Sequence, residues 1–293
     1  MASQHVIAIA GISGKLARYV VQELLKQPDV QIRGSCRDIT KLPTELTESP
    51  RISLVKADPF DVETLRNMVR GCDTVMCCYY ADDKTMFEGQ IILIDLCEEE
   101  GVGRYIASDY TADFTRLDLG DIVVKDPMKH VKAYLDTKER VKGIHILVGL
   151  MMETFLEYFH VWNPEENTLR YWGTGSEKWD LITYGTAAEY VAAAALDRHA
   201  TGVLKFAGSQ LSVLQMVDDI IAVYGIEPRL ERKGPLEDLS PYLKSTGSPQ
   251  DTIAAATYHV LTGKASLGET LDNERYPSIQ PKTFREFLKA RKA

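Results

Sequence analysis

The sequence lacks any long apolar run and is poor in proline, with 12 prolines and 20 glycines among 293 residues. No stretch approaches the roughly 18 apolar residues that a membrane-spanning helix needs, so we expect no contact with a membrane. Hydrophobic residues nevertheless make up 45% of the chain. That fraction excludes the disordered and collagen-like classes and favours a globular protein with a sizeable core.

Basic residues are scarce relative to acidic ones: Lys and Arg number 34 against 42 Asp and Glu, which gives a net charge of −8. An acidic chain repels polyphosphate, so nucleic acid is not an expected partner. No basic leader precedes the first apolar run at residues 6–10. We therefore expect a soluble cytoplasmic protein, a monomer or a homodimer.

Cysteine is also rare and odd in number, and its five copies fall in the first third of the chain: Cys36, Cys72, Cys77, Cys78 and Cys97. Their spacing matches no zinc site. Cys77 and Cys78 are neighbours on a predicted strand and point to opposite faces, so we expect no disulfide between them. We expect reduced thiols in a core, and no metal.

The first half of the chain alternates between short apolar runs and stretches with helical spacing. Strands are predicted at 6–10, 30–36, 52–56, 74–80, 104–107 and 144–150, and helices at 18–26, 62–69, 85–100 and 126–141. Such alternation is typical of parallel strands joined by helical crossovers. It predicts an α/β fold with a Rossmann-type doubly wound sheet, whose ligands bind beyond the carboxyl ends of the strands.

The second half loses this alternation, which predicts a dinucleotide-binding domain over 1–150 and a smaller mixed lobe over 151–293. We expect some segments of that lobe, for example 184–210, to pack back on the first domain. Residues 155–184 are rich in aromatic side chains and include all three Trp. They form either the core of the lobe or the wall of a pocket for a flat apolar ligand. The pocket residues that we predict are Asp109, Tyr110, Phe155, Phe159, His160 and Trp172.

A glycine-rich turn lies between the first strand and the first helix. Its spacing is G-x-x-G-x-x-A, from Gly11 to Ala17. Glycines at such a turn let backbone N–H groups and the helix N-terminus approach a pyrophosphate. The residues predicted to contact it are Gly11, Ser13, Gly14, Lys15 and Leu16.

The end of the second strand indicates which dinucleotide binds. An NAD site would place Asp or Glu there, on the ribose 2′-hydroxyl. This chain has Arg37 instead, with Lys41 nearby, and both cations suit a 2′-phosphate. Asp38 offers the alternative that Arg37 forms only a surface ion pair. We predict NADP as the cofactor.

Taken together, these motifs resemble the atypical short-chain dehydrogenases of the NmrA-like and isoflavone-reductase-like group. The resemblance rests on Gly11–Ala17, Arg37-Asp38, Ala57-Asp58, Gly101–Asp109, Lys138, Gly149–Phe155 and Tyr171–Gly175. It implies that Asp58 lies near the adenine and that Tyr79 and Tyr80 lie beside the cofactor. It further implies that Lys138 contacts the nicotinamide ribose and that the nicotinamide borders on Gly149, Leu150 and Met151.

A catalytic group is predicted from residue types. Tyr134 and Lys138 are four apart and share one face of a helix, and Ser108 ends the fifth strand. A nearby ammonium favours the phenolate, so the tyrosine becomes a usable acid or base. The order Ser…Tyr-x-x-x-Lys resembles the triad of extended short-chain dehydrogenases. A helix rich in Tyr and Lys also produces this spacing by accident, and Asp109, Tyr110 and His130 are alternative donors.

Three functions follow from these features. The first is an NADPH-dependent reductase of an aromatic or polycyclic small molecule, in secondary-metabolite biosynthesis. The second is a non-redox isomerase, cyclase or rearrangement enzyme in which the bound cofactor is a scaffold. The third is a non-catalytic sensor of the NADP(H) redox state, as in the NmrA regulators. The reductase needs a hydride from NADPH, whereas the non-redox enzyme does not. Both enzymes need catalytic groups, whereas the sensor does not.

Overall fold

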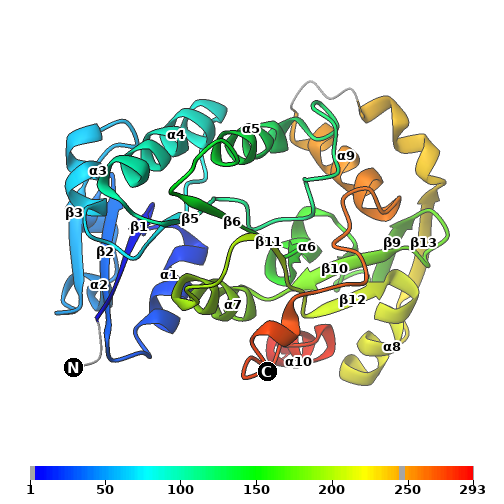
Figure 1. Ribbon diagram of the computed structural model, residues 1–293. Helices are drawn as coiled ribbons and strands as arrows, with labels where there is room; N and C mark the ends of the chain where they lie inside the picture. The colour runs from blue at the N-terminus through cyan, green and yellow to red at the C-terminus, as the bar shows by residue number, and fades with distance from the viewer. Residues whose placement is uncertain (1–3, 244–247, 293) are drawn as a thin grey trace. The chain divides into compact units, whose positions relative to one another are not determined.

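A computed structural model describes residues 4–243 and 248–292. The chain forms two compact units (Figure 1). Of the described residues, unit 1 comprises 4–109, 127–146 and 188–204, and unit 2 comprises 110–126, 147–187, 205–243 and 248–292. The chain thus passes between the units several times, and residues 188–204, inside the expected segment 184–210, belong to unit 1.

Unit 1 is built on a seven-stranded sheet with the order β11-β6-β5-β4-β1-β2-β3. Strands β1 to β6 pair in parallel, and their order is that of a doubly wound dinucleotide-binding sheet. The predicted fold class is confirmed. The strands are β1 (His5–Ala10), β2 (Val30–Cys36), β3 (Ile52–Lys56), β4 (Thr74–Cys77), β5 (Arg104–Ile106), β6 (Lys142–Leu147) and β11 (Gly202–Lys205).

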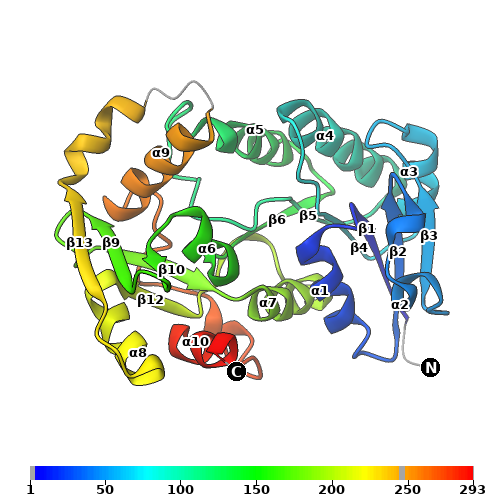
Figure 2. The ribbon, with the colours of Figure 1, turned by 180° about the vertical axis from the view of Figure 1, so that it is seen from behind.

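Helices cover both faces of this sheet. Figures 1 and 2 show α3, α4 and α5 on one face and α1 and α7 on the other. The helix ends follow capping chemistry: the Asp82 carboxylate accepts a hydrogen bond from Thr85 N at the start of α4, and Gly101 ends it in the left-handed conformation. The helices are α1 (Lys15–Leu24), α2 (Thr44–Thr47), α3 (Val62–Val69), α4 (Asp83–Glu100), α5 (Asp126–Leu135) and α7 (Tyr184–Leu196), with short 3₁₀ turns η1 (Ile39–Lys41) and η2 (Val123–Lys125).

The core of unit 1 contains the cysteines that the sequence predicts there. Cys36, Cys72, Cys77 and Cys97 are buried free thiols, while Cys78 is only half-buried. Burial raises the pKa of the Cys72 thiol to about 11. The four buried cysteines therefore act as small apolar side chains.

Unit 2 contains two small sheets, with the orders β12-β10-β7 and β13-β9-β8. These short strands and the helix α9 lie where the sequence shows no clean alternation. The elements are β7 (Leu150–Met151), β8 (Trp162–Asn163), β9 (Thr168–Trp172), β10 (Lys178–Ile182), β12 (Ser209–Ser212), β13 (Arg229–Gly234), α6 (Met152–Tyr158), α8 (Val213–Tyr224), η3 (Leu236–Tyr242), α9 (Pro249–Leu261), η4 (Asn273–Arg275) and α10 (Phe284–Lys292).

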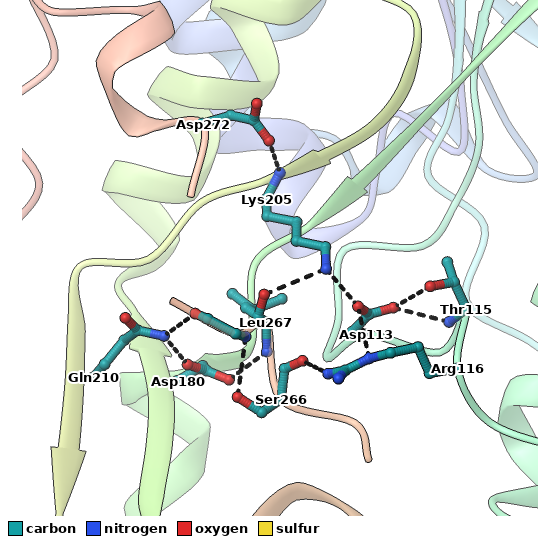
Figure 3. A network of polar contacts seen from close by, with 10 residues as sticks. Asp113, Thr115, Arg116, Asp180, Lys205, Gln210, Ser266, Leu267 and Asp272 are labelled. Carbon is teal, nitrogen blue, oxygen red and sulfur yellow. Dashed lines mark hydrogen bonds and ion pairs between the residues drawn. The ribbon is translucent and has the colours of Figure 1, made fainter. Parts of the chain in front are cut away.

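A buried polar network joins distant segments within unit 2 (Figure 3). The Asp113 carboxylate accepts hydrogen bonds from Lys205 Nζ at 2.7 Å and from Thr115 N at 2.9 Å. Asp180 accepts from Leu267 N at 2.7 Å. Buried carboxylates of this kind are stable only when they are paired. The network explains why residues 110–126, which lie between β5 and α5 in the chain, fold with unit 2.

Candidate dinucleotide site

The glycine turn after β1 has the shape that a phosphate-binding loop needs. Gly11 adopts a φ of +82°, and a methyl group on its Cα would lie 2.9 Å from the Cys78 carbonyl oxygen. Only glycine fits such a position. Gly14 is the N-cap of α1, and no side chain caps this helix end. The first-turn N–H groups of α1 are therefore available to an anion.

Arg37 follows β2 and is exposed, and within the described part of the chain it makes no hydrogen bond or ion pair. Asp38 pairs with Lys41 instead, with Nζ 3.3 Å from Oδ2, and it accepts a hydrogen bond from Thr40 N. The hydrogen bonds from Thr40 and the charge of Lys41 hold the pKa of Asp38 below its usual value. The alternative of an Arg37–Asp38 pair is thus wrong, and Arg37 is the unpaired cation.

Three further residues of the predicted site lie after β3 and β4. Asp58 is exposed, and its carboxylate accepts a hydrogen bond from Phe60 N at 3.0 Å. Strand β4 ends at Cys77, earlier than the predicted Tyr80. Tyr79 is half-buried, and burial raises its pKa, whereas Tyr80 is 99% exposed. The parallel pairing places the ends of β1, β2, β3 and β4 at one edge, so these residues share the carboxyl edge of the sheet.

Tyr134 and Lys138 do meet, as their spacing predicts. Lys138 Nζ donates to Tyr134 Oη at 2.9 Å and lies 2.7 Å from Asp95 Oδ1. Tyr134 Oη donates to the same carboxylate oxygen at 2.6 Å. Burial acts to lower the pKa of Lys138, but the hydrogen bonds to Asp95 and Tyr134 outweigh it and raise that pKa. Each group in this cluster thus satisfies another.

The cluster lies near the amino edge of the sheet, away from the carboxyl ends of the strands. It joins the C-terminal half of α4 to the end of α5, where Glu98 accepts a hydrogen bond from Val141 N just before β6 begins. Lys142 N in turn donates to Gly103 O, just before β5 begins. Ser108 lies at the other end of β5, five residues or about 16 Å farther along an extended strand. The predicted Ser108, Tyr134 and Lys138 triad is therefore not assembled, and Lys138 does not reach the edge where a dinucleotide binds.

The side chain of Ser108 is buried and already bonded. Its hydroxyl donates to the Tyr79 carbonyl at 2.7 Å, and its backbone N–H donates to Gln90 Oε1 at 3.0 Å. The single hydroxyl proton is therefore committed to the protein. The prediction that Ser108 holds a substrate oxygen is not supported by this arrangement.

Asp109 is also buried. Its Oδ2 lies 2.7 Å from Nδ1 of His145 on β6, and its side chain has no exposed surface. The pair joins the ends of β5 and β6. The Asp109 side chain thus joins β5 and β6 within unit 1, and its predicted place in a substrate pocket stays a prediction.

The first turns of α5 carry further titratable groups, toward the carboxyl edge from which a crossover helix starts. The helix begins at Asp126, directly preceded in the chain by the segment from the end of β5, and Lys129 and His130 follow within two turns. His130 packs against Phe87, in the second turn of α4, with ring centroids 5.7 Å apart. Lys129, which the sequence analysis missed, could have been found from the direction in which a crossover helix runs back along the sheet.

Unit 2 contains a cavity of about 590 Å³. One side consists of aromatic rings, and α9 supplies Ile253, Ala254 and Leu261 on the other. Phe159, His160 and Trp172 line it, as predicted, together with Tyr171 and Trp179. His160 adopts a φ of +52°, a rare conformation for a residue other than glycine. The volume and the aromatic walls are typical of a pocket for a small organic ligand.

The remaining predicted residues lie in unit 2, apart from this cavity. Phe155 is only 1% exposed and packs on Trp179 with ring centroids 5.1 Å apart, so it is a core residue and not a pocket wall. Leu150 and Met151 form β7 and pair with β10, and Gly149 has a φ of +67° against Asp180. Tyr110 is half-buried with a φ of +34°. Their predicted contacts with a nicotinamide or substrate stay predictions.

Neither a metal site nor a membrane segment is found in the described residues. No group of three His, Cys, Asp or Glu side chains within 4–243 and 248–292 could hold a metal ion. Over the same residues, no helix is long and apolar enough to cross a membrane.

Known proteins match parts of the chain. Residues 11–144 match the family model described as NAD(P)H-binding. Oxidoreductase dmxR7 of Cryptosporiopsis sp. (strain 8999) is 30% identical over 79 residues, which is 26% of this chain and 33% of that protein. Oxidoreductase nsrR of Aspergillus novofumigatus is 30% identical over 79 residues, 26% of this chain and 30% of that protein. The match spans about a third of either relative.

Solved structures match the whole chain in fold. AtPrR2 with NADP+ and (+)pinoresinol has a TM-score of 0.81 at 16% identity, with 99% of each chain covered. An isoflavone reductase has a TM-score of 0.81 at 19% identity, covering 98% of this chain and 99% of that one. Leucoanthocyanidin reductase with NADPH from Vitis vinifera has a TM-score of 0.80 at 16% identity, with 98% and 99% covered. The predicted resemblance is confirmed for the fold and for the NAD(P)H-binding domain.

Proposed function

From the premise that residues 11–144 form an NAD(P)H-binding domain within an isoflavone-reductase-like fold, we propose that the protein is an NADPH-dependent reductase of an aromatic small molecule. The observation that carries the proposal is the carboxyl edge of unit 1. There a glycine turn without room for a Cβ, an uncapped helix end and an unpaired arginine lie together. A reduced nicotinamide, when bound, supplies a hydride to the substrate.

The preference for NADPH over NADH rests on Arg37. Its guanidinium is exposed at the end of β2 and pairs with no described carboxylate, because Asp38 is taken by Lys41. A free guanidinium matches a phosphate monoester in charge and in hydrogen-bond geometry. No Asp or Glu occupies the end of β2 to accept a ribose 2′-hydroxyl. Lys41 is expected to contribute less to phosphate binding, since its ammonium is paired with the Asp38 carboxylate.

The aromatic class of the substrate rests on the cavity of unit 2. Phe159, Trp172 and Trp179 present ring surfaces there, and flat apolar ligands stack on such surfaces. His160 lines the same cavity, and the described residues offer it no hydrogen-bond partner. His160 is therefore suited to hydrogen-bond an oxygen substituent of the ligand.

We assign proton transfer to the start of α5 and not to Tyr134. Lys129 and His130 lie in its first turns, toward the edge where the dinucleotide domain binds its ligand. Tyr134 and Lys138 are occupied with Asp95 near the opposite edge. A positioned acid or base contributes about 10²–10⁴-fold to a rate, so the two assignments differ measurably.

Mixing the purified protein with NADPH and a panel of aryl-substituted enones, imines and alkenes tests the proposal. A reductase consumes NADPH and forms a reduced product in equal amounts. Binding of NADPH without turnover on the whole panel contradicts the reductase. Product that still forms when NADP+ replaces NADPH would mean a non-redox rearrangement, because NADP+ carries no hydride to give.

A further inference from the structure

We infer that Ser108 is a positioning residue for the dinucleotide loop and acts through Tyr79, in place of a catalytic role on the substrate. This inference rests on the proposed binding of NADPH at the glycine turn. It deepens that proposal, because it gives Ser108 a role in cofactor affinity, whereas the Ser…Tyr-x-x-x-Lys order predicts a role in catalysis.

The first step is the bond between Ser108 and Tyr79. Ser108 is 5% exposed, and its hydroxyl donates to the Tyr79 carbonyl at 2.7 Å. Tyr79 follows β4, and Ser108 follows β5, which is the neighbouring strand. The bond therefore ties two strand ends together at the carboxyl edge. A buried hydroxyl with a carbonyl partner at this distance is a firm constraint.

The second step is the support of Ser108 by Gln90. Gln90 lies on α4 with no exposed surface, and its Oε1 accepts hydrogen bonds from Ser108 N at 3.0 Å and from Tyr105 Oη at 3.2 Å. Its Nε2 donates to Met86 O at 2.7 Å. A buried amide with both ends satisfied holds a fixed orientation. Ser108 is thus locked to α4 as well as to β4.

The third step is the contact between the Tyr79 ring and the glycine turn. A methyl group on Gly11 would lie 3.1 Å from Cδ1 of Tyr79, and one on Gly89 of α4 would lie 3.4 Å from Cε2. The ring therefore fills the space between the phosphate-binding turn and α4. If the Tyr79 backbone shifts, the wall beside Gly11 shifts with it.

Together the contacts form a chain from Gln90 through Ser108 and Tyr79 to Gly11. All four residues belong to unit 1. The chain holds the loop in one shape before the cofactor arrives, and such preorganisation raises affinity by lowering the cost of ordering on binding. Removing the Ser108 hydroxyl is expected to weaken NADPH binding and to leave proton transfer unchanged.

The test compares Ser108→Ala with Thr74→Val. Thr74 is buried at the start of β4, at the opposite end of this strand from the glycine turn. Its hydroxyl donates to Ala195 O at 3.0 Å. Each substitution removes one buried hydroxyl-to-carbonyl bond, so both are expected to lower the melting temperature. Only Ser108→Ala is expected to raise the Kd for NADPH, by about fivefold to tenfold, as measured by calorimetry.

Values of kcat across pH, taken together with the Kd for NADPH, separate positioning from catalysis: a positioning residue leaves the pH profile of kcat unchanged. If Ser108 acts on the substrate, Ser108→Ala lowers kcat and leaves the Kd for NADPH unchanged, and this result overturns the inference. In a Tyr79→Leu background, Ser108→Ala is expected to change the Kd for NADPH no further, because the ring through which it acts is gone. An undiminished effect in that background contradicts the route through Tyr79.

Two controls keep the outcomes distinct. Wild-type protein that binds no NADPH defeats the proposed function itself, whatever the variants do. If Ser108→Ala does not fold, Ser108→Cys retains a weak donor of similar size and replaces it in the same comparison. The inference requires a weakened Kd with an unchanged pH profile there as well.

Discussion

The two edges of the sheet in unit 1 carry polar clusters of opposite character. At the carboxyl edge some groups are satisfied, such as Ser108 by Tyr79, but two are not: Arg37 has no described partner, and α1 begins without a side-chain cap. Near the amino edge they are satisfied, since Asp95, Tyr134 and Lys138 bond one another. Polar groups without a protein partner are available to bind a ligand, whereas the bonded groups near the amino edge hold α4 against the end of α5. The comparison teaches that residue types alone do not mark a site.

The largest effect is expected at Gly11. Gly11→Ala places a methyl group 2.9 Å from the Cys78 carbonyl oxygen at a φ of +82°. The turn must distort, so we expect NADPH affinity to fall about 100-fold or more. Titration of NADPH into the variant measures this loss.

Gly71→Ala is the matched control for that change. Gly71 has a φ of +73° but open space around its Cα. The variant carries the same backbone strain, about 1 kcal/mol, without a clash. Its Kd for NADPH should equal that of the wild type, and a loss there would mean that strain alone weakens binding.

The next largest effect is expected on kcat, which compares a lysine toward the carboxyl edge with one near the amino edge. Lys129→Met at the start of α5 should lower kcat about 100-fold, because a positioned proton donor is lost. Lys138→Met should leave kcat within about twofold, since among the described residues the Lys138 ammonium bonds Asp95 and Tyr134 and no other side chain. Steady-state rates of both variants decide between them. A large loss for Lys138→Met alone would restore the Tyr134 hypothesis.

Cofactor preference gives a smaller effect. Arg37→Gln should weaken NADPH binding about tenfold and leave NADH binding unchanged, because only NADPH carries the 2′-phosphate. Lys41→Gln is the control, because Lys41 is already paired with Asp38. We expect it to weaken NADPH binding about twofold or less. Equal losses for both cofactors in Arg37→Gln would show that Arg37 does not contact the 2′-phosphate.

The smallest effect concerns stability at high pH. The pKa of Lys138 is raised in the folded protein above its ordinary value of 10.5. Its contribution is therefore complete below pH 10.5 and is lost as the pH rises through the higher folded value. It amounts to about 0.5–1 kcal/mol, because the pair is partly exposed. Denaturant unfolding across this range should show the loss in wild type and not in Lys138→Met.

Local chemistry explains which parts of the site the sequence predicts. The glycine turn and the alternation of strands and helices follow from residues that are close in the chain, and the structure has a glycine turn before α1 and a doubly wound parallel sheet. The meeting of Tyr134 and Lys138 follows equally from a spacing of four. The prediction leaves out their place near the amino edge, which the direction of α5 along the sheet determines. Lys138 lies beyond Leu135, where α5 ends.

Tertiary contacts decide what the sequence cannot predict. The bond from Ser108 to Tyr79 joins residues 29 apart and depends on β4 and β5 being neighbours. Likewise, Asp113 draws residues 110–126 into unit 2 through Lys205, 92 residues away. Helix α9 also escapes prediction, since its apolar residues match a cavity wall and not a regular amphipathic face. Only the folded chain brings these partners together.

Hydrogen exchange with and without NADP+ tests the comparison of the two edges most directly. Peptides covering 9–20 and 76–82 contain the glycine turn and Tyr79, while 131–142 contains Tyr134 and Lys138. Bound cofactor is expected to slow exchange in the first two peptides and to leave the third unchanged. Protection confined to 131–142 would contradict the assignment of the dinucleotide to the carboxyl edge.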